Sequence, residues 1–273
     1  GRHNRREIVR QSGKMTPTII AIVSVAVFFS AMLLSLERGY RAAVRIGSSE
    51  KMGVAALDTA IYALLGLLLA FSFYASGDRF SERRRLAVDE ANAIENVVLR
   101  LDLLPESHRA QLGGLLREYL DARVAYNQEL SANLEQVHWR RADDLQDEIW
   151  DALVSAGGNS SPNLVHVAVM PSVVTMFDLA ATQYYASKNH IPIPIVVLLI
   201  GLSLLAANLA GRSSPGEGTR SWLHRAAFAG SIALTLVVVI DLDYPRLGLI
   251  RIDYTDAMYA DTYETLDRHS RAK

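Results

Sequence analysis

The stretch Asp58–Ser76 reads DTAIYALLGLLLAFSFYAS and has the length and composition of a membrane-spanning helix. A hydrocarbon core of about 30 Å is crossed by roughly 20 helical residues. The stretch nevertheless begins with a carboxylate and ends with a serine. Ionisable groups are costly inside a bilayer and usually face a bundle interior or water. The polar edge of this helix is therefore the first candidate for a functional surface.

Three further apolar segments divide the rest of the chain. They predict an all-α membrane protein with four transmembrane helices and a helical cytosolic domain between the second and third spans. A basic flank precedes the first span, but its apolar run is longer than that of a signal peptide, so we expect a retained helix. The predicted segments are a basic cytosolic N-terminus at 1–16, spans at 17–36, 54–76, 192–211 and 223–243, the cytosolic domain at 77–190 and a cytosolic C-terminal tail at 244–273.

The distribution of basic residues predicts the orientation of these spans. Four spans place both termini and the middle domain on one side, where twelve Lys and Arg flank the membrane against seven on the other. The positive-inside rule then puts both termini in the cytoplasm, as expected for a multi-pass protein of the bacterial inner membrane. The whole chain has 28 basic and 29 acidic residues, which disfavours a nucleic-acid partner.

The middle domain carries helix signals throughout. Apolar residues recur at three- and four-residue spacing between Leu86 and Leu104, and Pro105 marks the start of another helix. A third helix is expected to end at Gly157-Gly158, and a fourth to begin at Ser161-Pro162 with a kink or break at Pro171. The domain has 11 basic against 17 acidic residues, which favours nearby cations.

The polar edge of the second span forms a narrow stripe. At about 100° per residue, the positions that return to the direction of Asp58 all lie within about 40° of it. One hypothesis makes this stripe the lining of a pore, with a carboxylate near the outer mouth, a leucine constriction and serines at the inner exit. The alternative is ordinary helix packing, with the carboxylate reaching water at the interface. The stripe consists of Asp58, Tyr62, Leu65, Leu69, Ser72 and Ser76, while Phe71 and Tyr74 point the other way.

Other candidate chemistry in the sequence is sparse. Asp241 and Asp243, at the end of the fourth span, could coordinate a cation through oxygen ligands or simply meet interfacial water. The histidines lack the spacing of metal ligands, and phosphate-binding loops and hydrolase motifs are missing, so neither a cofactor nor an enzyme is predicted. There is no cysteine.

Several motifs resemble the bacterial bestrophin-like family of four-span membrane proteins. They are GLLLAFSFYASGDRFSERRRLAVDEANAIENVVLRLDLLP with the later LLREYLDARV, the segment MFDLAATQYYASKNHIPIPIVVLLIGLSLLAANLAG, and DLDYPRLGLIRID after the fourth span. Together they cover most of the chain between about residues 54 and 254.

The resemblance implies a pentameric channel whose second span lines the pore with an apolar neck, here Leu65 and Leu69. It matches Asp243, Pro245 and Gly248 to a region that approaches a calcium clasp in bestrophins, although the dense acidic cluster of that clasp is missing here. Gln183 stands where the family pattern has arginine, and Glu95-Asn96 replaces a pair of small residues. These departures bear on any salt bridge or close packing at those positions.

Two functions follow from these observations. The first is an oligomeric ion channel in the lipid bilayer, a homopentamer by resemblance, that conducts small inorganic ions. A ring of Asp58 carboxylates and an acidic vestibule favour cations, whereas the likeness to bestrophins suggests anions. The second is a non-conducting membrane scaffold or sensor whose cytosolic helices bind a protein partner.

Overall fold

A computed structural model describes residues 2–46, 51–129, 132–158, 165–213, 222–244 and 255–271. All regular structure in these ranges is helical, and they contain no strand. The chain forms two compact units. We call Gly1–Phe80 with His190–Arg251 the membrane unit, and Ser81–Asn189 with Ile252–Lys273 the helical domain.

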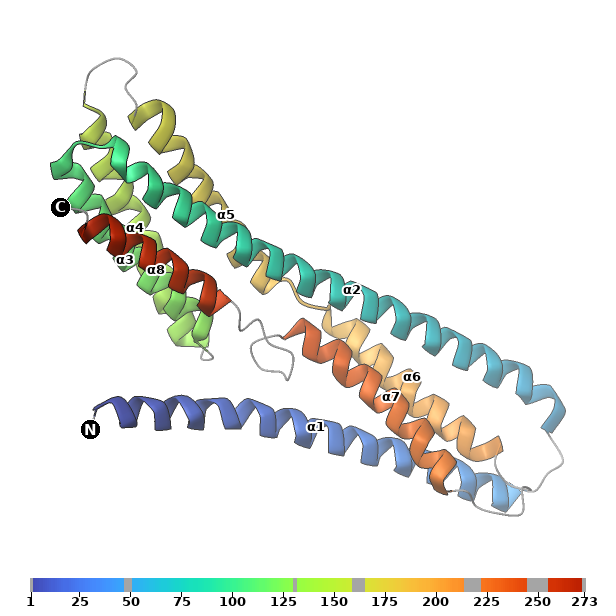
Figure 1. The fold of residues 1–273 in the computed structure, drawn as a ribbon. Helices are drawn as coiled ribbons and strands as arrows, with labels where there is room; N and C mark the ends of the chain where they lie inside the picture. Colours follow the sequence, from blue (N-terminus) through green and yellow to red (C-terminus); the bar gives the residue numbers. More distant parts are fainter. Residues whose placement is uncertain are drawn as a thin grey trace. The chain divides into compact units, whose positions relative to one another are not determined.

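The membrane unit contains long helices (Figure 1). They are apolar enough to cross a bilayer, and the protein is a multi-pass membrane protein. Candidate spans lie at Ile22–Arg45, within Ala55–Leu103, within Val167–Ser213 and at Trp222–Asp243. Helix α1 also continues back through the segment predicted as a separate basic N-terminus. The helices are α1 (Arg2–Ile46), α2 (Lys51–Arg100), whose first part lies in this unit, α6 (Ile193–Ser213) and α7 (Trp222–Asp243).

Helices α1 and α6 are in backbone contact. A Cβ atom added at Gly39 would lie 1.9 Å from the carbonyl oxygen of Asn208, closer than any side chain allows. The Ser35 hydroxyl donates to the Leu204 carbonyl oxygen at 2.7 Å, and the Asn208 amide donates to the Ser35 carbonyl oxygen at 3.2 Å. Small residues and interhelical hydrogen bonds of this kind replace the hydrophobic effect as the source of helix association in lipid.

The helical domain packs around one apolar core. Its elements are the second part of α2, the 3₁₀ turn η1 (Leu101–Leu103), α3 (Glu106–Gln128), α4 (Ala132–Gly157), the π turn η2 (Val165–Val169), α5 (Met170–Lys188) and α8 (Thr255–Arg271). Pro105 is the N-cap of α3, and α4 ends at Gly157 before Gly158, which has a positive φ of 58°. Pro171 lies in the first turn of α5, directly after the π turn, while Ser161-Pro162 lies outside the described residues.

Helix α8 is a packed element, whereas the sequence predicts a C-terminal tail at 244–273. Tyr259 and Leu266 of α8 are buried in the core of the helical domain. The Tyr263 hydroxyl donates to Asp121, and Arg117 forms an ion pair with Asp267. The sequence does carry the signal, because Tyr259, Thr262 and Leu266 recur on one helical face.

Candidate functional site

The stripe on α2 faces the interior of its own protomer. Leu65 and Leu69 are only 3% and 9% exposed, and they belong to an apolar cluster with Leu199 of α6 and Leu236 of α7. Tyr62 is partly buried and meets the Phe228 ring edge-on, with ring centroids 6.3 Å apart. The stripe is therefore the seam along which α2 packs on α6 and α7.

The polar members of the stripe share this orientation. Ser72 and Ser76 are buried, and Asp58 is partly buried. Side chains that are covered within one subunit cannot also line a path between subunits. The pore lining by Asp58, Tyr62, Leu65, Leu69, Ser72 and Ser76 stays a prediction, and the burial of Leu65, Leu69, Ser72 and Ser76 favours the packing alternative.

The opposite face of α2 is uncovered. Leu67, Phe71 and Tyr74 are 52%, 62% and 73% exposed, and Ala56 and Ala60 extend the same face toward the start of the helix. At about 100° per residue, all five lie within about 40° of the direction opposite Asp58. This face is apolar and aromatic, and it is free to meet lipid or another copy of the chain.

A polar network joins the helices of the membrane unit where α7 ends. Arg79 Nε donates to Asp243 Oδ1 at 2.9 Å, and Arg79 Nη2 donates to the Ser76 hydroxyl oxygen at 3.3 Å. The Ile191 backbone N–H donates to Asp243 Oδ2 at 2.9 Å. His190 Nδ1 lies 3.4 Å from the same oxygen, and its ring stacks on Tyr244 at 4.4 Å. One carboxylate therefore ties α2, the residues just before α6 and the end of α7 together.

This network argues against the predicted metal site at Asp241 and Asp243. Asp243 is 1% exposed, and each of its carboxylate oxygens already accepts a hydrogen bond from Arg79 or Ile191. Across the described part of the chain there is no group of three or more acidic or histidine side chains that could hold a metal ion. Asp243 is a structural anchor in this arrangement. Pro245 and Gly248, the other residues of that motif, lie outside the described residues.

The core of the helical domain contains a buried ion pair. Glu90 of α2 and Arg123 of α3 have fully covered side chains and are joined by two hydrogen bonds, one of them 2.9 Å long. Gln183 of α5 accepts a further hydrogen bond from Arg123, and Tyr259 of α8 donates to Glu90. The Arg123 guanidinium also lies 5.0 Å from the centre of the Tyr126 ring.

Electrostatics keep Arg123 charged and its tyrosine neighbours neutral. Burial disfavours the Arg123 guanidinium cation, but the attraction of Glu90 outweighs it and raises the pKa of Arg123. Burial, together with the Glu90 charge, raises the pKa of Tyr259 well above its usual value, and burial also raises the pKa of Tyr119. Gln183 thus provides an acceptor for Arg123 where an arginine would bring a second positive charge.

The Glu95-Asn96 pair occupies the rim of this core. Glu95 is partly buried and Asn96 is exposed, where its backbone and side-chain oxygens accept from Arg100 at 2.8 and 3.3 Å. In the part of the chain that the structure describes, neither residue of this pair forms a hydrogen bond or ion pair with Glu90 or Arg123, so its departure from small side chains affects the surface of α2.

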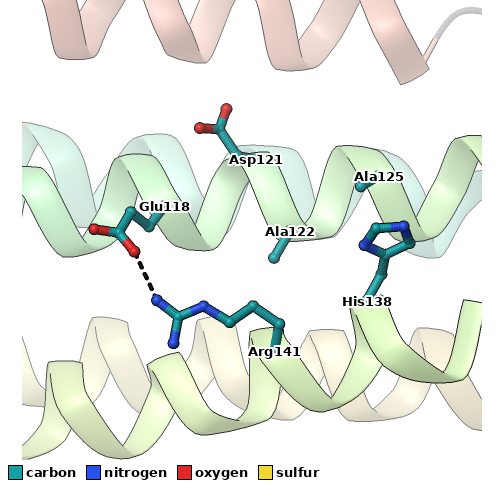
Figure 2. Close-up of a pocket in the computed structure, with 6 residues that line it drawn as sticks. All are labelled: Glu118, Asp121, Ala122, Ala125, His138 and Arg141. Atoms are coloured by element: carbon teal, nitrogen blue, oxygen red, sulfur yellow. Dashed lines mark hydrogen bonds and ion pairs between the residues drawn. The ribbon is translucent and has the colours of Figure 1, made fainter. Parts of the chain in front are cut away.

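A polar groove of about 320 Å³ lies between α3 and α4 (Figure 2). Ala122 lies among its charged side chains, Ala125 lies beside His138, and Glu118 forms a 2.6 Å ion pair with Arg141 across the groove (Figure 2). Arg141 also pairs with Glu148 at 3.1 Å. Asp121 accepts from Tyr263 of α8. Its charges are largely matched within the domain, so the groove has the character of an interhelical seam.

Comparisons with known proteins agree with this architecture. A point mutant of a bacterial bestrophin homologue from Klebsiella pneumoniae aligns over 88% of this chain and 96% of its own, with 14% identity and a TM-score of 0.68. A second mutant of a Klebsiella pneumoniae homologue aligns over 90% and 98%, with 12% identity and a TM-score of 0.67. A crystal structure described as a membrane protein gives 14% identity, 90% and 96% coverage and a TM-score of 0.69. These similarities establish the fold.

No curated protein matches the chain. The family model described as the bestrophin-like domain matches residues 54–257, which is most of the chain and includes nearly all of α2 and the buried Glu90–Arg123 pair. The protein therefore belongs to the bestrophin-like family.

Proposed function

We propose that this protein is an ion channel in which several copies surround a common axis and turn the uncovered face of α2 toward it. The chain belongs to the bestrophin-like family, and the resemblance of this family to bestrophin channels supports conduction as the general function. The observation that supports this role of α2 is how little of it is covered within the protomer. Of the four apolar helical stretches, that of α2 is the least covered within its protomer, with 11% of its most apolar window buried against 17%, 22% and 33% for the others.

The side chains on this face suggest where a pore would be wide and where it would be narrow. Ala56, Ala60 and Ala63 are small and occupy the beginning of the helix. Leu67, Phe71 and Tyr74 follow at i, i+4 and i+7 and are large. A ring of such apolar side chains forms a hydrophobic constriction that opens and closes by wetting and dewetting. We place the neck at Leu67 and Phe71 instead of Leu65 and Leu69.

Assigning the pore lining to the uncovered face of α2 changes the expected ion selectivity. The expected preference for cations depended on a ring of Asp58 carboxylates, but Asp58 lies on the stripe that packs within the protomer. The remaining electrostatic argument for cations is the acidic helical domain, which has 17 acidic and 11 basic residues between positions 77 and 190. Reversal potentials in asymmetric salt decide between cations and anions.

One helix per subunit encloses a pore only when several subunits assemble. A pentamer with both termini on the cytoplasmic side is the arrangement we favour, in a bacterial inner membrane. Class averages viewed along the membrane normal, from protein in nanodiscs, test the number of copies. A monomer or dimer would rule out an axial pore built from α2.

The conduction test uses single substitutions in planar bilayers. Leu67→Ala and Phe71→Ala remove large side chains from the proposed neck, so we expect higher open probability or unitary conductance. Leu198→Ala is the matched control, because Leu198 is 49% exposed but lies on α6. Leu65→Ala tests the buried face and should lower stability with little effect on conductance. Unchanged currents in both neck variants would refute the assignment.

A scaffold or sensor that binds a cytosolic protein remains the second candidate. Its support is a set of exposed apolar side chains in the helical domain, each 41% to 72% exposed. Such side chains favour contact with protein, which in a channel is a neighbouring subunit. The scaffold predicts no current from reconstituted protein and a stoichiometric cytosolic partner. The residues are Leu99, Leu103, Leu134, Val137, Val154 and Tyr185.

A further inference from the structure

At the other end of the membrane unit, the ends of three helices bring arginines together. We call Arg38, Arg41, Arg45, Arg212 and Arg225 the arginine cluster. The first three recur at i, i+3 and i+7 and therefore lie on one face near the end of α1, where all three are exposed. Arg212 is in the last turn of α6, and Arg225 is in the first turn of α7.

Backbone contact between α1 and α6 holds this cluster together. A Cβ atom added at Gly211 would lie 2.9 Å from the backbone nitrogen of Tyr40, so Arg212 begins directly beside α1. Arg212 Nε donates to the Asn208 side-chain oxygen at 3.1 Å, and Asn208 in turn donates to the Ser35 carbonyl oxygen. The position of Arg212 is thus fixed by the same contact that packs the two spans.

Arg225 is the anchored member of the cluster. Its side chain is 13% exposed, its guanidinium lies 4.3 Å from the centre of the Tyr40 ring, and it pairs with Glu37 at 3.3 Å. Arg41 pairs with the other oxygen of Glu37 at 2.9 Å, although its own side chain is 69% exposed. Two guanidinium groups therefore share one carboxylate, so these three side chains together carry a net positive charge.

The remaining arginines are not matched by a carboxylate within the described ranges of the chain. Among the described residues, Arg38, Arg45 and Arg212 form no ion pair with a carboxylate. In the described ends of α1, α6 and α7, the five guanidinium groups are thus balanced by one carboxylate, that of Glu37. Like charges gathered in this way are unfavourable unless an anion lies among them.

We propose that the arginine cluster binds the phosphate of an anionic phospholipid headgroup. The cluster lies where three spans end, which is the depth of lipid phosphates in a bilayer. Trp222, the first residue of α7, is 73% exposed, and tryptophan is enriched at this interface. Guanidinium groups bind phosphate oxygens through paired hydrogen bonds, which suits arginine better than lysine. The proposal does not depend on conduction, because headgroup binding needs only one protomer.

The test measures lipid binding by the full-length protein in neutral detergent micelles. We expect added phosphatidylglycerol to raise the melting temperature and to remain bound in native mass spectra, whereas phosphatidylcholine does neither. The triple variant Arg38→Gln, Arg41→Gln, Arg45→Gln should weaken phosphatidylglycerol binding about 100-fold, since each interfacial arginine contributes roughly five-fold. The matched Arg→Lys triple keeps the charge and should lose only part of this affinity.

The control removes equal charge elsewhere. The triple Arg100→Gln, Arg109→Gln, Arg140→Gln lies in the helical domain and should bind phosphatidylglycerol like the wild type. Equal stabilisation by phosphatidylcholine, or undiminished phosphatidylglycerol binding by the Arg38, Arg41 and Arg45 triple, would overturn the proposal. Stabilisation by inorganic phosphate as large as that by phosphatidylglycerol would show a site for free phosphate and overturn the assignment to lipid.

Discussion

Gly211 of α6 lies against the backbone of Leu36 in α1: a Cβ atom added at Gly211 would lie 2.0 Å from the Leu36 carbonyl oxygen. Gly39 makes the reciprocal contact with Asn208. Two spans thus meet at backbone distance near their common end, and this contact supports both the packing of the membrane unit and the arginine cluster.

Substitution of Gly211 by alanine should separate these helices. The obstructing atom is a backbone oxygen, which cannot rotate away as a flexible side chain could, so we expect Gly211→Ala to destabilise the protein by about 1–3 kcal/mol. Thermal unfolding in detergent measures the change. Gly201→Ala is the control in the same helix, because nothing lies within 4 Å of a Cβ there. Its melting temperature should stay the same or rise, since alanine is the better helix former. Equal melting temperatures for the two variants would contradict the close contact.

Loss of one partner of the buried Glu90–Arg123 pair should be costly. Arg123→Met leaves the Glu90 carboxylate fully buried without its countercharge, which costs about 3–5 kcal/mol. The double variant Glu90→Leu, Arg123→Met removes both charges and should recover much of the loss. Chemical denaturation of the full chain, followed by circular dichroism, measures both variants. Arg141→Met breaks exposed pairs with Glu118 and Glu148 and should cost less than about 1 kcal/mol. A double variant no more stable than Arg123→Met would argue against the pair as the cause.

Asp243 should behave as an anchor. Asp243→Ala leaves Arg79 and the Ile191 N–H without their acceptor, so we expect a loss of about 1–3 kcal/mol. Asp78→Ala changes an exposed carboxylate on the same part of α2 and should change stability by less than about 0.5 kcal/mol. Similar melting temperatures for the two variants would contradict the anchoring role.

Calcium should leave the stability of the protein unchanged. The oxygens of Asp243 are already occupied by protein donors, so neither excess calcium nor a chelator is expected to shift the melting temperature. A calcium-dependent rise that disappears in Asp243→Asn would restore the metal site that the sequence suggested at this carboxylate.

The helical domain should lose stability in alkali. Burial raises the pKa of Tyr119 and Tyr259 above the usual value near 10, so these phenols keep their protons in the folded protein after they have lost them in the unfolded chain. Their contribution is fully present below about pH 10 and declines as the pH rises through the folded-state values. Urea unfolding at pH 8 and pH 11 measures the change. Tyr259→Phe should reduce the alkaline loss, and an identical loss in this variant would exclude Tyr259 as a source.

Length and periodicity determined much of this architecture directly. Apolar runs of about 20 residues predict membrane helices because the backbone must satisfy its own hydrogen bonds in lipid. Three- and four-residue spacing from Leu86 onward predicts the long helix that enters the domain core, where Ile94, Val97 and Leu101 are buried. The same spacing in α8 could have identified Tyr259 and Leu266 as core residues.

The partner of each helical face was decided by the tertiary structure alone. The sequence shows that Asp58, Leu65 and Ser76 share one side of α2, because the helical repeat fixes directions about its axis. It does not show what lies in that direction: Leu65 packs on α6 and α7, and the Ser76 hydroxyl accepts from Arg79 one turn away. A polar stripe in lipid seeks any buried partner, protein or water. Only the folded protomer distinguishes a protein partner from water, because it covers this side of α2 and leaves Leu67 and Phe71 exposed.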